Sequence, residues 1–191
     1  MLLFAGLGNP GQNYAMNRHN VGFMAVNLLA ERYGFPAWQK KSTALQSAGR
    51  IGTDKIILVK PQSYMNKSGL PVAEVARFHK ISPDNIFVFH DELDLAAGRL
   101  RVKQGGGHGG HNGLRDIIGK LSGQQDFYRL RLGIGHPGKH QDVVNYVLRK
   151  APDSEYTLFT DAMNEALHYL PDAICGEWQK AMHGLHSAVI T

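Results

Sequence analysis

The sequence predicts a single three-layer α/β domain over residues 1–191, in which helices flank a mixed, twisted β-sheet and the C-terminal part is helical. Short apolar runs alternate with stretches whose apolar residues recur at i, i+3, i+4 and i+7, the spacing of one helix face. The chain has 191 residues, 43% hydrophobic and 19% charged, so it can bury one core. No repeat, linker or low-complexity segment divides it.

The N-terminal part predicts a strand, a helix and a hairpin. Residues 2–7, LLFAGL, are a short apolar run ending near glycine, which is typical of a buried strand. Asn20 is placed to cap a helix that Gly34 closes. Residues 44–51 and 55–61 flank a glycine turn, which predicts a β-hairpin.

The middle of the chain predicts a second helix and two further strands. Ser68, with Pro71 in the first turn, opens a helix that continues to about His79. Residues 85–94, NIFVFHDELD, are a continuous apolar strand that ends in charged groups. Residues 98–104 alternate in polarity and predict an edge strand.

The C-terminal part continues the alternation and then becomes helical. A helix is expected from about Asn112, because Leu114, Ile117, Ile118 and Leu121 have helical spacing. Residues 127–135 predict another strand, in which basic and apolar residues alternate. The tail from Gln141 predicts helices broken at Pro152 and Pro171.

Charge and composition limit the class of protein. The net charge of +5 and the isoelectric point near 9.4 favour a polyanionic partner. The apolar N-terminus has no basic region before it, and no run approaches the roughly 20 apolar residues of a membrane span. A lone cysteine, Cys175, cannot form an internal disulfide. We therefore expect a cytoplasmic protein with no export signal and no membrane contact.

Four loops are expected to form the binding site. In α/β sheets, ligands collect at the carboxyl ends of the strands. The loops at such ends are Gly8–Asn20, Pro61–Asn66, His90–Asp94 and the glycine-rich stretch Gly105–Gly113, GGGHGGHNG.

A dinucleotide site is one interpretation of the first loop. GLGNPG, at residues 6–11, has the G-x-G-x-x-G spacing. Pro10, however, removes an N–H donor where a pyrophosphate needs one, and the helix expected from Asn20 starts too far away. No acidic residue ends a second strand, since Glu31 lies within the helix pattern. These departures disfavour the nucleotide interpretation.

A metal site and a general base are the other two interpretations. His108 and His111 are three residues apart and His90 precedes Asp91, but flanking glycines would leave such ligands unheld, and no cysteine or H-E-x-x-H pattern supports them. His19 lies just before a helix in the first loop and Asp91 lies at the end of a central strand. These two places can be neighbours in an α/β sheet, so the carboxylate could orient the imidazole as a base. Each also has a simpler role, as a surface histidine near a helix start or an aspartate capping a turn.

Four motifs, taken in order, carry a resemblance. GLGNPGQNYAMNRHNVGF, KPQSYMNKSG, FHDELDLAAGRLRVKQGGGHGGHNGLRDI and YRLRLGIGHPG resemble those of bacterial peptidyl-tRNA hydrolases, from the first strand to about Val147. The resemblance implies a monomeric, metal- and cofactor-independent esterase that acts on peptidyl-tRNA and frees the tRNA. It implies His19 as proton acceptor, Asp91 as the group that orients it, and Asn9 as the residue that tells N-blocked from free aminoacyl groups.

The same resemblance assigns the remaining site residues. The positions that match contacts to the peptide and the 3′ end are Tyr14, Tyr64, Asn66 and Asn112. Met65 is expected to form a flexible apolar wall of the site, and His111 is expected at the rim of the substrate site, at the N-terminus of the helix. Asn66 or Asn112 is the expected oxyanion donor, although a turn and a helix cap are the roles that their positions alone favour. The residues expected against acceptor-stem phosphates are Lys103 and Arg131, with Arg101, Arg129, Lys139 and His140 as weaker candidates.

Overall fold

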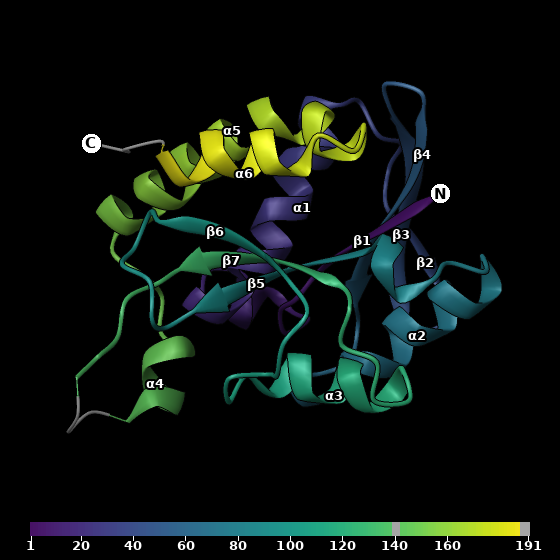
Figure 1. Cartoon of the computed structure of the whole chain (residues 1–191). Helices are drawn as coiled ribbons and strands as arrows, with labels where there is room; N and C mark the ends of the chain where they lie inside the picture. The colour runs from purple at the N-terminus through teal and green to yellow at the C-terminus, as the bar shows by residue number, and fades with distance from the viewer. Residues whose placement is uncertain (139–141, 188–191) are drawn as a thin grey trace.

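A computed structural model describes residues 1–138 and 142–187 (Figure 1). It has three layers, as the sequence predicts, with one mixed seven-stranded sheet between two helical layers. The strands are β1 (Leu2–Gly6), β2 (Gln39–Lys41), β3 (Ala44–Ile51), β4 (Asp54–Pro61), β5 (Ile86–Glu92), β6 (Leu100–Gln104) and β7 (Tyr128–Gly133). The helices are α1 (Val21–Arg32), α2 (Gly69–Phe78), α3 (Asn112–Lys120), α4 (Val143–Val147), α5 (Asp153–Ile174) and α6 (Trp178–Ser187).

The strand order β2-β3-β4-β1-β5-β7-β6 brings the expected loops together. β1 pairs in parallel with β4 and with β5, and β5 pairs in parallel with β7. The carboxyl ends of these four strands therefore lie at one edge of the sheet, where ligands bind in α/β folds. β3 pairs antiparallel with β4, β2 pairs antiparallel with β3, and β6 pairs antiparallel with β7. β6 is the edge strand that its alternation predicts.

Two apolar cores hold the layers, one on each face of the sheet. Alternation along β1 sends Phe4 to one core and Leu3 and Ala5 to the other. The first core packs the sheet against α1 and α5, and the second packs it against α2 and α3. Figure 1 shows the same division, with α1, α5 and α6 on one side and α2 and α3 on the other. No helix in the described part of the chain is long and apolar enough to cross a membrane.

The break expected at Pro171 is wrong, because α5 continues through it to Ile174. A proline inside a helix leaves the carbonyl four residues earlier without its N–H donor. Here that carbonyl belongs to Leu167, and the hydroxyl of Tyr33 donates to it over 2.8 Å. A tertiary contact thus replaces the missing helical hydrogen bond, and the helix ends instead before Gly176, whose φ is +92°.

Candidate active site

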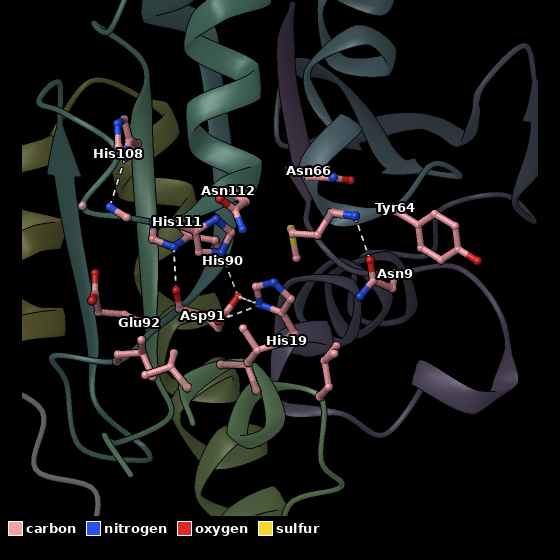
Figure 2. A pocket seen from close by; sticks show the side chains of 18 of the residues that line it. Asn9, His19, Tyr64, Asn66, His90, Asp91, Glu92, His108, His111 and Asn112 are labelled. Atoms are coloured by element: carbon pink, nitrogen blue, oxygen red, sulfur yellow. Dashed lines mark hydrogen bonds and ion pairs between the residues drawn. The ribbon is translucent and has the colours of Figure 1, made fainter. Parts of the chain in front are cut away.

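A cavity of about 550 Å³ lies at the carboxyl edge of the sheet and is lined by all four expected loops. Figure 2 shows side chains from these loops turned toward one another. A fifth element, α4, completes the wall with Val143, Val144 and Val147, together with Leu148 directly after the helix. These residues and His136, which also lines the cavity, are not among the residues expected from the sequence.

His19 reaches the cavity because α1 lies unusually close to the sheet. It stands in a short 3-10 turn, Arg18–Asn20, that runs directly into α1. At the first turn of α1, a Cβ on Gly22 would lie 2.3 Å from the Phe89 carbonyl oxygen, so only glycine permits this approach. The close packing places the turn beside the end of β5, where Asp91 lies.

Asp91 joins two histidines. Nδ1 of His19 lies 2.9 Å from each carboxylate oxygen of Asp91, and Nε2 of His111 lies 2.9 Å from Oδ1. The side chain of Asp91 is only 3% exposed. Two imidazoles thus approach one buried carboxylate from different elements (Figure 2).

The hydrogen-bond pattern fixes the protons on both rings. Nδ1 of His111 accepts the N–H groups of Gly113 and Leu114, so its proton is on Nε2, which donates to Asp91. A carboxylate only accepts, so His19 donates from Nδ1. In the neutral ring Nε2 then carries a free lone pair, and it points into the cavity (Figure 2). This is the orientation that a general base requires.

Two expectations about the glycine loop are wrong. The first residue of α3 is Asn112, but His111 caps the helix. Flanking glycines do not leave His111 unheld either, because both of its ring nitrogens are bonded. Among the described residues, His19, Asp91 and His111 form a possible metal-binding group, with donor atoms within 4.8 Å of one another. Each nitrogen nevertheless faces a carboxylate oxygen at hydrogen-bond distance, which is the geometry of a His–Asp–His hydrogen-bonded set.

The ionisation of the three buried groups follows from this arrangement. Burial alone would raise the pKa of Asp91, but the two histidines outweigh it and hold that pKa well below its ordinary value. Burial alone would lower the pKa of His19, but the charge and hydrogen bond of Asp91 outweigh it and raise that pKa. Burial, with His111 nearby, lowers the pKa of His90 to about 3, so His90 stays neutral.

Asn9 is held so that its amide donors face the cavity. Its backbone exchanges two hydrogen bonds of 2.9 Å with the side chain of Asn20, which therefore does not cap α1 as expected. Its side-chain oxygen accepts the N–H of Met65 over 2.7 Å. Since that oxygen is occupied, Asn9 presents Nδ2 to the cavity (Figure 2).

The other expected contacts lie around the same cavity. The rings of Tyr14 and Tyr64 meet edge to face at 6.2 Å, and Tyr64 is 59% exposed. Met65 is buried in the wall between Asn9 and α3. Asn66 has no side-chain hydrogen bond to any residue of 1–138 or 142–187. Asn112 is exposed, and its side-chain oxygen accepts from Arg115 over 2.8 Å.

Basic side chains form two cross-strand pairs between β6 and β7. Arg101 pairs with Arg131, and Lys103 with Arg129. Lys103 is exposed, whereas Arg131 forms a 2.9 Å ion pair with Glu92 and keeps 28% of its side chain exposed. Arg129 is only 3% exposed, so its expected place on an RNA-facing surface is wrong. The last two weaker candidates, at positions 139 and 140 (Lys139 and His140), lie outside the described residues.

The comparisons with known proteins agree with one another. The family model described as peptidyl-tRNA hydrolase matches residues 3–190. A peptidyl-tRNA hydrolase of Teredinibacter turnerae is 49% identical over 191 residues, which covers 97% of each chain. One of Saccharophagus degradans is 50% identical over 186 residues, covering 97% of this chain and 94% of its own. The crystal structure of the Acinetobacter baumannii enzyme has a TM-score of 0.93 at 41% identity, covering 98% and 95% of the two chains. The chain belongs to the peptidyl-tRNA hydrolase family.

Proposed function

We propose that this protein hydrolyses the ester between a peptide, or an N-blocked aminoacyl group, and the 3′-terminal ribose of tRNA, with His19 as the general base. The observation that carries the mechanism is the orientation of His19: Asp91 accepts from Nδ1, and Nε2 opens onto the cavity. A water beside Nε2 loses a proton to it and attacks the ester carbonyl. The bond to the ribose oxygen then breaks, and His19 returns the proton to that oxygen.

The reaction needs little more than these groups. An ester whose ribose carries a neighbouring hydroxyl is a reactive acyl group, so a positioned water suffices without a covalent nucleophile. A general base contributes about 10²- to 10⁴-fold, and one oxyanion donor about 10²- to 10³-fold. Asn66 and Asn112 both line the cavity, and the contact of Asn112 with Arg115 uses its oxygen and leaves Nδ2 free, so both amides are our candidates for the oxyanion donor.

Asn9 is suited to reading the blocked amine. It offers an N–H donor to the cavity, and an N-acyl group supplies the carbonyl acceptor next to the ester. A free aminoacyl group has a charged ammonium there instead, which cannot accept a hydrogen bond and would face a donor. The site therefore favours N-blocked substrates.

Lys103 of β6 and Arg131 of β7 are the residues that we propose to contact the RNA backbone. Like charges directly opposite on neighbouring strands are destabilising, and phosphates bound along Lys103 and Arg131 would relieve this repulsion. Such contacts position the acceptor stem without reading its sequence, which suits an enzyme that accepts many tRNAs. Because its substrate is a tRNA, we place the protein in the cytoplasm. We also propose that it works as a monomer built from one catalytic domain.

Hydrolysis of N-blocked aminoacyl-tRNA by wild type and His19→Ala, with and without EDTA, tests the proposal. His168→Ala is the matched control, since His168 is exposed on α5, a helix outside the cavity wall. We expect His19→Ala to lose about 10²-fold or more in kcat/KM, and EDTA to change nothing. Full activity of His19→Ala would refute the general base. Abolition by EDTA would indicate a metal hydrolase, and RNA binding without hydrolysis by wild type would indicate a binding module.

A further inference from the structure

Arg129 differs from the other basic residues of the sheet because its side chain is buried. It lies on β7, directly opposite Lys103 and two residues before Arg131. Its exposed fraction is 3%, so a phosphate cannot reach the guanidinium without a rearrangement. A buried guanidinium needs hydrogen-bond acceptors nearby.

The acceptors are two consecutive carbonyls of the glycine loop. Nη1 of Arg129 donates to the carbonyl of Gly105, and Nη2 donates to that of Gly106. The guanidinium also lies over the ring of Phe127, with 4.6 Å between its carbon and the ring centroid. The two donated hydrogen bonds and the ring contact hold the guanidinium in place.

The loop's glycines are what allow this contact. Gly105 and Gly106 have φ values of +71° and +93°, a region that other residues rarely adopt. A Cβ on Gly106 would lie 2.8 Å from Nζ of Lys103 and 3.2 Å from Nη1 of Arg129. The tip of Lys103 can move aside, but a side chain at Gly106 would crowd the Arg129 guanidinium and would be strained by the positive φ.

The loop is therefore anchored at two ends. Arg129 holds Gly105 and Gly106, and His111 holds the other end through the α3 cap and Asp91. Between the anchors, a Cβ on Gly107, Gly109 or Gly110 would meet nothing within 4 Å. The path of this open stretch, and hence the approach of His111 to Asp91, depends on where the two ends are held.

We propose that Arg129 is a positioning residue that fixes the base of the glycine loop, and thereby sets His111 and Asn112 against the cavity, without contacting RNA. The inference rests on the proposed function, since it assigns the loop to that active site. Arginine suits the role because its planar fork can donate to two neighbouring carbonyls at once. Lysine would keep the charge but not the two-point contact.

The test compares two substrates that differ in phosphate. One is N-blocked aminoacyl-tRNA, and the other is an N-blocked aminoacyl ester of adenosine, which has no phosphate. The variants are Arg129→Lys and Arg129→Met, with Arg99→Met as the control because Arg99 is exposed outside both the loop and the basic pairs. We expect both Arg129 variants to lose about 10- to 100-fold in kcat/KM on both substrates, the cost of a misplaced site. Arg99→Met should match wild type.

Two readouts separate positioning from RNA contact and from general damage. The log–log salt slope of tRNA binding should not change in Arg129→Lys, whereas loss of a phosphate contact lowers it by about 0.7 to 0.9. Amide hydrogen exchange across residues 105–111 should accelerate in both variants, with the rest of the sheet unchanged. A defect confined to tRNA, or a lowered salt slope, would overturn the proposal in favour of direct contact.

The remaining outcomes also decide the matter. Wild-type activity in both variants would overturn it, as would unchanged exchange in the loop. If Arg129→Met does not fold, Arg129→Lys carries the test, since it retains the charge and the aliphatic stem. If the wild-type protein hydrolyses neither substrate, the proposed function is refuted independently of this inference. The hydrogen-exchange experiment then still shows whether Arg129 anchors the loop.

Discussion

Replacing Asp91 by asparagine should reverse the proton on His19. The proton of His111 is fixed on Nε2, because its Nδ1 accepts from Gly113 and Leu114. His111 must therefore donate to the oxygen of the new amide. In the wild type, Nδ1 of His19 lies 2.9 Å from both carboxylate oxygens, so in the variant the amide NH₂ faces that nitrogen. Nδ1 must then accept, so the proton moves to Nε2, and His19 has no lone pair facing the cavity.

The expected loss in kcat/KM is the contribution of the general base. Such groups contribute about 10²- to 10⁴-fold, which corresponds to about 3 to 5 kcal/mol of transition-state stabilisation. Asp91 also raises the pKa of His19 against the opposing effect of burial, so without its charge that pKa should fall below 6.5. The assay is kcat/KM on N-blocked aminoacyl-tRNA between pH 5 and 9. Activity within ten-fold of wild type, with an unshifted pH profile, would refute the reasoning.

A second substitution sharpens this test. His111→Asn keeps an N-cap side chain but is too short to donate to Asp91 as the imidazole does. In Asp91→Asn/His111→Asn, the amide at position 91 is free to turn its oxygen toward His19 and restore the useful tautomer. We expect the double variant to be about ten-fold more active than Asp91→Asn alone, a difference of about 1.4 kcal/mol in transition-state stabilisation. Equal or lower activity would show that His111 does not control the amide.

Four further predictions concern the surrounding residues. Asn9→Asp keeps an acceptor for the N–H of Met65 but replaces the amide donor with a charged oxygen. When kcat/KM is measured with N-blocked and with free aminoacyl-tRNA, the value for the N-blocked substrate should fall about 10- to 100-fold, and its preference over the free substrate should narrow. Arg18→Met removes a two-point ion pair to a glutamate of α5, so urea denaturation should show a loss of about 2 kcal/mol in the free energy of unfolding, and an unchanged midpoint would contradict it. His90 stays neutral in the folded protein because its pKa is lowered to about 3, so it lowers the free energy of unfolding by roughly 1.4 kcal/mol for each pH unit below about pH 6.5. His90→Phe should remove this contribution between pH 6.5 and 5, and an identical pH dependence in the variant and the wild type would contradict the neutral state of His90. Lys103→Ala and Arg131→Ala should each lower the log–log salt slope of tRNA binding by about 0.7 to 0.9, and unchanged slopes would argue against phosphate contact.

Periodicity and the strand-end rule predict the layers and the meeting of four loops around one cavity. Apolar runs mark the central strands, and parallel pairing brings the four loops to one edge. These inferences succeed because they depend on local pattern and on a general property of α/β sheets. The resemblance then supplied roles for residues that the pattern alone left open.

What sequence reasoning missed depends on contacts between distant segments. The continuation of α5 through Pro171 requires a hydroxyl from Tyr33, and the neutral tautomer of His111 requires its own helix cap. Arg129 shares an alternating strand with Arg131, yet one is buried under the glycine loop and the other is partly exposed. The signal available for Arg129 was the pair of glycines opposite its strand, which has meaning only once the register is known.

The nitrogen-15 NMR spectrum of the His19 imidazole, followed between pH 5 and 9, tests the central claim most directly. The account expects a proton on Nδ1 and an unprotonated Nε2 in the neutral ring, with a pKa above 6.5 that matches the inflection of kcat/KM. A neutral ring protonated on Nε2, or a titration unrelated to activity, would contradict the role of His19 as a general base oriented by Asp91.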